Sequence, residues 1–281
     1  MLAALVIGFR EGLEAALIIG IVIGYLDKTG RVGQKRLAWA GAGLAVLLSA
    51  ALAAALTVVG AELEGPAEQI FEGSTMLLAV LVLTGMIFWM RLQARHLKSS
   101  LERELGAAVM SGQRWALFGV AFLAVFREGV ETALFLSASA FAADGMGTLI
   151  GALVGLAAAA LVGWALYASM VRLNLRTFFN ATSVLLLFFA AGLFAHGLHE
   201  FQEAGLLPIL SAQAWDLSAV LPTESLLGQL LRALFGYTAT PAVLEVVGYA
   251  LYWVLALAGV RWWVARRSAR LTTLAPSPAA G

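Results

Sequence analysis

The chain has 281 residues, of which 61% are hydrophobic and 12% charged, with a formal net charge of +1 and no cysteine. Its mean hydropathy of +0.89 excludes an ordinary soluble domain and is typical of a polytopic membrane protein. Without cysteine there are no disulfides, thiolate ligands or catalytic thiol, so a metal site would use oxygen, nitrogen or thioether donors.

Seven stretches are apolar enough and long enough, at about 20 residues each, to cross a bilayer as helices. The first lacks a basic n-region and carries charges where a signal peptide has an uninterrupted apolar core, so we expect it to be retained. The fold class is therefore an all-α membrane protein with seven transmembrane helices: residues 2–26, 36–60, 69–91, 114–141, 146–170, 178–201 and 243–265.

The first and fourth predicted helices carry two copies of one charged nonapeptide. Phe9–Leu17 reads FREGLEAAL and Phe126–Leu134 reads FREGVETAL, identical at 7 of 9 positions and 117 residues apart. Two glutamates three residues apart, with an arginine four before the second, project towards one helix face. Ionisable groups inside a bilayer are expensive and usually functional. We interpret six of them as an ion site: Arg10, Glu11, Glu14, Arg127, Glu128 and Glu131.

The charges of the two motifs favour a cation. Two arginines and four glutamates leave a net charge of −2 when all are ionised. Each arginine can satisfy one carboxylate, which leaves one per motif for a metal ion or a proton. The alternative is a pair of structural ion-pair clusters without a ligand, but buried ion pairs seldom stabilise a protein more than apolar packing does.

Glycines accompany the charged motifs. Gly12 and Gly129 remove side chains beside the carboxylates and would let a neighbouring helix approach closely. The pairs Gly8/Gly12, Gly20/Gly24 and Gly151/Gly155 share the small-xxx-small spacing, which usually indicates helix packing.

The duplicated motif divides the chain into two similar units. Because each unit has three spans, the second must enter the membrane from the opposite side, so the repeats are inverted and their motifs meet at similar depth, as in secondary transporters. The predicted divisions are 1–91 and 114–205 for the repeats, 92–113 for a cytoplasmic loop, 206–242 for an extracytoplasmic connection, 243–265 for a seventh helix and 266–281 for a cytoplasmic tail.

Basic residues fix the expected orientation. Of the 18 Lys and Arg, 15 fall on alternate connections, whereas the opposite connections are acidic or neutral. The positive-inside rule then places the amino terminus outside and the carboxyl terminus in the cytoplasm.

A second group of potential ligands lies at the end of the sixth predicted helix. It forms one helical stripe: His196, His199, Glu200 and Glu203. Mixed imidazole and carboxylate donors at this outer end suit iron, zinc or manganese better than calcium or magnesium, but a polar helix end at the interface is the alternative. Glu68 and Glu72 repeat the i, i+4 spacing at the outer side; a capping or solvated role is favoured there, and Glu72 is kept as a candidate ligand.

These motifs closely resemble those of the oxidase-dependent iron permease family, particularly its bacterial Efe-type members. The resemblance rests on Arg10–Glu14, Arg127–Glu131, His199–Gly205 and Leu234–Thr238, and it extends over about residues 1–265. It implies an iron permease of the cytoplasmic membrane, not an enzyme, with no cofactor and with iron as the transported substrate. Extracytoplasmic proteins that oxidise or deliver iron are the implied partners, and ferric ion the implied form.

Carried onto this sequence, the resemblance makes Glu11, Glu14, Glu128 and Glu131 iron ligands and the two arginines their organisers. The residues alone indicate only a hard or borderline cation, so a permease for lead, manganese or another divalent cation remains an alternative. An intramembrane di-metal oxidase is another, although such enzymes use Glu-x-x-His on inward-facing helices, and here the histidines lie far from the motifs in the predicted topology.

Overall fold

The computed structural model describes residues 1–93, 103, 105–107, 114–143, 145–168 and 174–273. Within these residues the secondary structure is helical, apart from a single isolated bridge between Gln213 and Ala242. The long helices are α1 (Leu2–Lys28), α2 (Lys35–Glu62), α3 (Pro66–Gln93), α5 (Arg114–Ala142), α6 (Gly145–Tyr167), α7 (Leu175–Glu203) and α9 (Val243–Thr273), with a short 3-10 helix η1 (Val32–Gln34) and the short helix α8 (Leu226–Phe235).

Five of these helices are long and apolar enough to cross a membrane: those within Val32–Glu62, Pro66–Met90, Gly145–Tyr167, Thr177–Glu203 and Val243–Arg261. The helices α1 and α5 are equally long, but the motifs place at least three charged residues in every 18-residue stretch of either one. Composition alone therefore sets apart the two helices that carry the candidate ion site.

Each predicted span coincides with one long helix, but two segments differ from expectation. The connection 206–242 contains α8, which the sequence analysis did not predict. The helix α9 runs to Thr273, eight residues beyond the predicted end at 265; charged residues are compatible with a helix, so the helix continues past the apolar stretch. Most of the predicted loop 92–113, and all of the tail from residue 274, lie outside the described residues.

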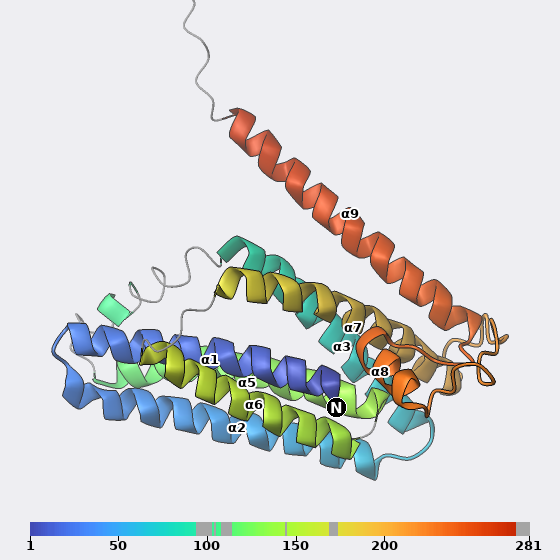
Figure 1. Cartoon of the computed structure of the whole chain (residues 1–281), viewed down its shortest axis with the longest axis horizontal. Coiled ribbons are helices and arrows are strands. Elements are labelled where there is room, and N and C mark those ends of the chain that lie inside the picture. Colours follow the sequence, from blue (N-terminus) through green and yellow to red (C-terminus); the bar gives the residue numbers. More distant parts are fainter. Residues whose placement is uncertain (94–102, 104, 108–113, 144, 169–173, 274–281) are drawn as a thin grey trace, which may run out of the picture.

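The long helices of each predicted unit pack mainly against helices of the other unit. The most extensive pairs are α1 with α6 and α2 with α5, followed by α3 with α7 and α1 with α5. In Figure 1, α1, α2, α5 and α6 lie side by side, α3 and α7 cover one side of them, and α9 projects away after packing on α7. The first helix of each unit therefore packs mainly on the second helix of the other.

Glycines create equivalent close contacts in the two units. A Cβ added to Gly41 of α2 would overlap the Phe118 carbonyl oxygen and approach the Phe122 nitrogen of α5. A Cβ added to Gly151 of α6 would meet Met1 and Leu5 of α1 in the same way. Phe118 and Phe122 follow Met1 and Leu5 by 117 residues, which is also the spacing of the two motifs.

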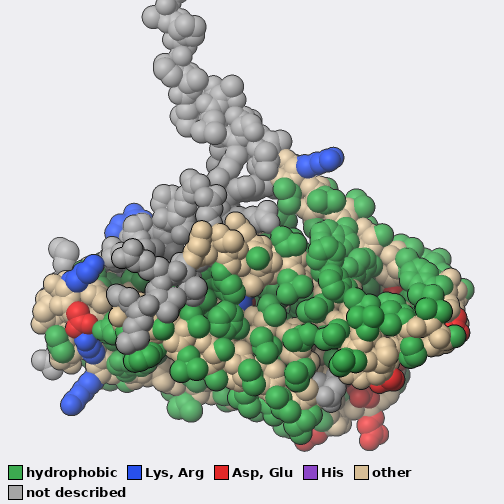
Figure 2. All heavy atoms as spheres, viewed as in Figure 1, with side chains coloured by type: hydrophobic (Ala, Val, Ile, Leu, Met, Phe, Trp, Pro, Cys, Tyr) green, Lys and Arg blue, Asp and Glu red, His purple; other side chains and the backbone are tan. Residues whose placement is uncertain are grey.

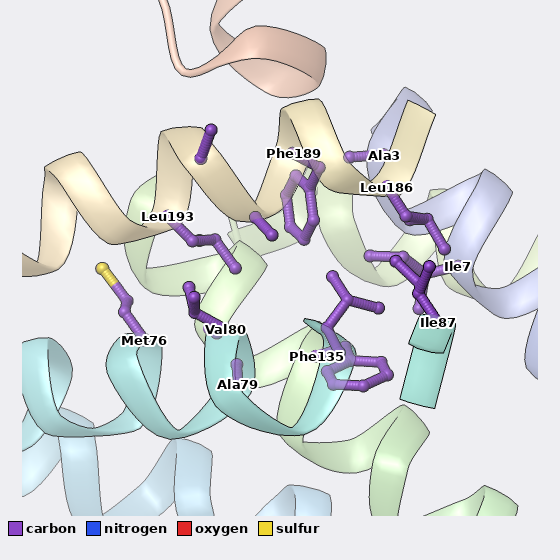
Figure 3. Close-up of a cluster of buried hydrophobic side chains, with 14 of the residues drawn as sticks. Ala3, Ile7, Met76, Ala79, Val80, Ile87, Phe135, Leu186, Phe189 and Leu193 are labelled. Atoms are coloured by element: carbon purple, nitrogen blue, oxygen red, sulfur yellow. The ribbon is translucent and has the colours of Figure 1, made fainter. Parts of the chain in front are cut away.

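The largest buried apolar cluster joins α1, α3, α5, α7 and α9. It includes Ile7, Phe135, Leu186 and Phe189, which are labelled in Figure 3, and Tyr252 of α9. A second cluster, around Val22, Leu26 and Leu117, joins the other ends of α1, α2 and α5. These two clusters lie on either side of the charged motifs and fix the helices that carry them.

The short helix α8 is defined by its caps. The Ser225 hydroxyl oxygen accepts a hydrogen bond from the Gly228 nitrogen at 3.0 Å at the amino end. At the carboxyl end Gly236 adopts φ +70°, the left-handed conformation that ends many helices. A Cβ on Gly192 of α7 would lie 2.6 Å from the Gly236 Cα, so glycine is needed at both positions for α8 to rest on α7.

Charge separates along the long dimension of the molecule. In Figure 2 most visible Lys and Arg side chains lie at the left end, where α1 turns into α2, and most Asp and Glu lie at the right end. The left end carries the exposed Lys28 and Arg36, whereas Glu62, Glu64 and Glu203 are exposed at the other.

Candidate functional site

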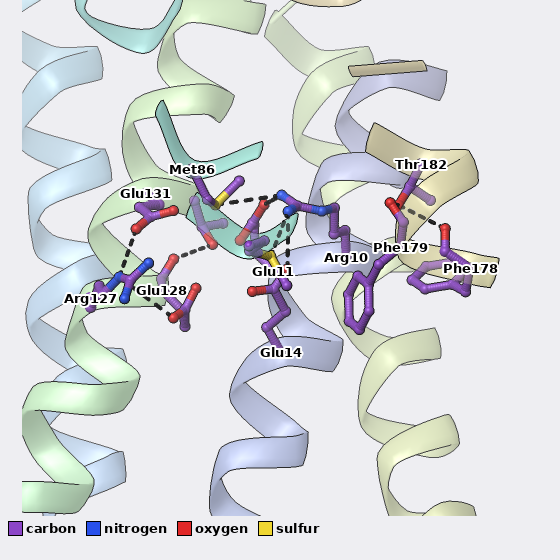
Figure 4. Close-up of polar contacts among 12 residues, drawn as sticks. Arg10, Glu11, Glu14, Met86, Arg127, Glu128, Glu131, Phe178, Phe179 and Thr182 are labelled. Atoms are coloured by element: carbon purple, nitrogen blue, oxygen red, sulfur yellow. Dashed lines mark hydrogen bonds and ion pairs between the residues drawn. The ribbon is translucent and has the colours of Figure 1, made fainter. Parts of the chain in front are cut away.

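The two charged motifs face each other across the contact between α1 and α5 (Figure 4). Each motif lies near the middle of its helix, with apolar turns on both sides. Arg10, Glu11, Glu128 and Glu131 are buried, at 0%, 1%, 5% and 9% exposure. The structure therefore brings together charged residues that lie 117 positions apart in the sequence, in a part of the protein that water scarcely reaches.

Three of the predicted ligands form a compact group. One carboxylate oxygen from each of Glu11, Glu128 and Glu131 lies within 4.8 Å of the other two. Oxygens bound to one transition-metal ion at about 2.1 Å lie at most about 4.2 Å apart. A side-chain movement of less than about 1 Å would therefore let all three carboxylates bind one ion.

Each of these carboxylates also has an oxygen without a protein partner. The Oε2 atoms of Glu11, Glu128 and Glu131 are buried and accept no hydrogen bond. A buried carboxylate oxygen without a partner is costly, and native structures keep few of them without a functional reason. The group is thus suited to a cation with a preference for oxygen ligands.

Arg10 is fully buried, and both of its terminal nitrogens have partners. Its Nη1 lies 2.6 Å from Glu11 Oε1, and its Nη2 lies 3.2 Å from Glu14 Oε1. Nη1 and Nη2 also donate to the Sδ atoms of Met86, at 3.5 Å, and Met90, at 3.0 Å. This guanidinium therefore occupies one oxygen of Glu11 and leaves the other free.

Arg127 is held more loosely than its counterpart. Its Nε donates to Glu131 Oε1 at 3.0 Å and lies 3.9 Å from Glu128 Oε1. The guanidinium stacks over the Trp89 ring, 4.3 Å from the centroid, and 44% of the side chain is exposed. The duplicated sequence thus has two different surroundings, one fully enclosed and one open on one side.

Glu14 lies beside the three-carboxylate group rather than within it. Its side chain is 11% exposed and pairs with Arg10, and it is close enough for the charges of Glu128 and Glu131 to act on it. All four motif glutamates are therefore neighbours, but three of them have ligand oxygens within reach of one ion.

The motif glycines lie where the helices come closest. A Cβ on Gly12 would lie 2.9 Å from Ala159 Cβ and 3.0 Å from Leu156 Cδ2 of α6. A Cβ on Gly129 would overlap the side chain of Ser49 on α2. The glycines thus permit α6 and α2 to pack directly behind the two motifs.

The predicted outer stripe lies along the end of α7 and pairs within itself. His199 Nε2 lies 3.2 Å from Glu203 Oε1, and His196 Nε2 lies 4.0 Å from Glu200 Oε1. Gln69 of α3 donates to Glu203 Oε2 at 3.4 Å. Half-buried Glu72, also on α3, lies close enough to Glu200 for the two carboxylates to repel each other. In the described part of the chain these residues are separate from the three-carboxylate group.

The sequence analysis missed Glu245, which completes the surroundings of His199. Glu245 lies in the first turn of α9, is 6% exposed, and places Oε1 3.2 Å from His199 Nδ1. The same oxygen accepts a hydrogen bond from the Ala242 nitrogen at 3.1 Å, the Glu half of a capping box. An acidic residue two positions after the predicted helix start at residue 243 was the available signal, but only the fold places it beside α7.

The apolar helices and the buried charged cluster define an integral membrane protein with three converging carboxylates between two of its helices. The chain belongs to the Iron permease FTR1 family, whose profile matches residues 1–270. It is similar to the ferrous iron permease EfeU of Yersinia pestis, with 43% identity over 260 residues, which is 92% of each chain. The ferrous iron permease EfeU of Escherichia coli O6:K15:H31 is 41% identical over 92% of this chain and 94% of its own. No solved structure matches the chain.

Proposed function

We propose that this protein takes up iron across the cytoplasmic membrane, and that iron passes through the cluster of Glu11, Glu128 and Glu131. One observation carries the proposal: three buried carboxylates from two helices converge, each with an oxygen that no protein group satisfies. Carboxylates can replace the water shell of an iron ion, and the ion in turn offsets the excess negative charge. Membership of an iron permease family supports iron as the substrate.

The transport path crosses two inverted three-helix units, α1–α3 and α5–α7. The packing of α1 with α6 and of α2 with α5 supports this arrangement. The equivalent glycine contacts support it as well, because their partner residues on α1 and α5 are 117 positions apart. In such transporters one repeat rocks against the other around a central site. The α1–α5 contact, which holds the carboxylates, is then the place where such a movement would open the site to either side.

The amino terminus lies outside in this proposal and the carboxyl terminus in the cytoplasm. The basic end of the molecule, with Lys28 and Arg36, is the cytoplasmic end under the positive-inside rule. Iron delivered or oxidised by extracytoplasmic partner proteins would reach the stripe of His199 and Glu203 first and then the three-carboxylate group.

The oxidation state of the iron is the open choice within this proposal. The relatives are named ferrous iron permeases, whereas an all-carboxylate site is a hard donor set that fits ferric ion. We favour ferric ion at the central site because the three converging ligand groups, from Glu11, Glu128 and Glu131, are all carboxylates. The uptake experiment decides between the two forms.

The test is radio-iron uptake into proteoliposomes, with iron supplied as a ferric chelate or as ascorbate-reduced ferrous ion. Glu131→Gln and Glu128→Gln keep the shape of the side chain but remove the charge, and we expect uptake to fall at least about tenfold. Glu224→Gln, in an exposed connection, is the matched control and should transport like the wild type. Equal uptake by all variants would assign the motifs a structural role.

Competition in the same vesicles separates iron from other cargoes. An excess of manganese or lead that abolished iron uptake, and was itself transported faster, would favour a permease for those ions. Oxygen consumption by the purified protein with ferrous iron would favour an oxidase, but the ligand group in the described residues contains only carboxylates, without the histidines of di-iron bundles.

A further inference from the structure

One turn of α3 provides partners for both motif arginines. Met86 and Met90 accept hydrogen bonds from Arg10, and the Trp89 ring lies under the Arg127 guanidinium. The three residues occupy positions i, i+3 and i+4, so they share one face of the helix. This face of α3 therefore contacts the motif of α1 and the motif of α5 at the same depth.

Thioethers suit the surroundings of Arg10. A sulfur atom accepts a hydrogen bond weakly and brings no charge. Arg10 is fully buried, and its Nε already lacks a partner. The two sulfurs thus satisfy donors that water cannot reach. They leave the whole positive charge of the guanidinium to Glu11 and Glu14, whereas an additional carboxylate would compete for it.

The indole ring of Trp89 is the uncharged partner of the Arg127 guanidinium. Cation–π attraction holds a guanidinium over a ring without adding charge. From this position the Arg127 Nε donates to Glu131 Oε1 at 3.0 Å, and Glu131 Oε2 remains free.

We propose that Met86, Trp89 and Met90 are positioning residues for iron transport. They hold the two arginines in place so that one oxygen each of Glu11, Glu128 and Glu131 stays available to the ion. This inference rests on the proposed function. Because α3 contacts both arginines, it also ties the geometry of one half of the site to that of the other.

Two double variants separate positioning from packing. Met86→Leu with Met90→Leu keeps apolar volume but removes both acceptors. Met86→Gln with Met90→Gln keeps the side-chain length and offers carbonyl acceptors to Arg10, at the expense of apolar character. If the methionines act through packing, the leucine double variant should transport iron faster than the glutamine double variant. If they position Arg10, the glutamine double variant should be the faster of the two. Met76→Leu is the control, because Met76 is a fully buried residue of the same helix with no hydrogen bond to an arginine.

The measurement is uptake of ferric and ferrous iron by proteoliposomes over a range of concentrations, normalised to folded protein by size-exclusion chromatography. At sub-saturating iron we expect the leucine double variant to lose about tenfold, chiefly through a higher KM, since two charge-assisted hydrogen bonds are lost. The glutamine variant should recover most of the loss, and Met76→Leu should match the wild type. Trp89→Leu should lose about threefold, and Trp89→Phe less, because it keeps an aromatic face.

Three outcomes would overturn the inference. Uptake by the leucine variant equal to or above that of the glutamine variant would assign the methionines to packing. Loss of uptake in both double variants, with loss of ferrous-ion binding by the purified proteins, would make the sulfurs direct ligands instead. No difference between Trp89→Leu and the wild type would remove Trp89 from the assignment. Absence of uptake by the wild type in every form of iron would instead refute the proposed function, so the two failures are distinguishable.

Discussion

Gly12 and Gly20 lie on the same helix, two turns apart, and the structure predicts opposite effects of the same substitution. A Cβ on Gly12 would lie 2.9 Å from Ala159 Cβ and 3.0 Å from Leu156 Cδ2, whereas a Cβ on Gly20 would meet nothing within 4 Å. Alanine within a helix is more favourable than glycine by roughly 0.5–1 kcal/mol. We therefore expect Gly20→Ala to be neutral or slightly stabilising.

Gly12→Ala carries the same gain in helix propensity but forces α1 and α6 apart. Overpacking a well-filled contact typically costs about 1–3 kcal/mol, so the substitution should be destabilising by roughly 0.5–2 kcal/mol after the propensity gain. Ala159→Gly should relieve the closest overlap and leave Leu156, whose side-chain end can move. The double variant should then be more stable than the sum of the single changes predicts, by about 1 kcal/mol.

The assay is unfolding of the detergent-solubilised protein, with iron uptake measured in parallel. Because Gly12 lies between Glu11 and Glu14, a displaced α1 should also lower uptake, and Ala159→Gly should restore part of it. If Gly12→Ala behaved like Gly20→Ala, or if the effects of Gly12→Ala and Ala159→Gly were simply additive, the close approach of α6 behind the motif would be refuted.

Three further predictions concern the charges and caps. Arg10→Met should destabilise the protein by about 3–5 kcal/mol in chemical unfolding, because Arg10 is fully buried and its loss leaves buried carboxylates unpaired. Arg127→Met should have a smaller effect, since that side chain is 44% exposed. Equal effects would contradict the difference in burial between the two arginines. Gly236→Ala should destabilise the protein measurably in thermal unfolding, because it must adopt φ +70° against Gly192; an unchanged midpoint would exclude this contact. Glu245→Ala should cost about 1 kcal/mol and Glu245→Gln less, since glutamine can still accept the cap hydrogen bond; equal losses in unfolding would mean that the charge beside His199 matters more than the cap.

The helices could be predicted from the sequence because each requirement is local. Apolar stretches of about 20 residues have few alternatives to a helix in a membrane, and each of the seven predicted stretches coincides with a long helix in the described residues. The candidate site residues could also be predicted from the sequence. Arg10, Glu11, Glu128 and Glu131 lie in apolar segments, where charged residues are costly and usually functional. The short helix α8 was not predicted, because ten residues inside a long connection give too weak a periodic signal.

The sequence by itself determined the helical class, the duplicated motif and, through that motif, the family. Only the tertiary structure decided which groups meet. Sequence spacing can place Glu11 and Glu14 on one face, but the distances between Glu11, Glu128 and Glu131 depend on how α1 and α5 pack. The partners of the arginines on α3 and the approach of Glu245 to His199 were also beyond the sequence. Contacts between helices depend on the close packing of side chains far apart in the chain, and no local periodicity records that packing.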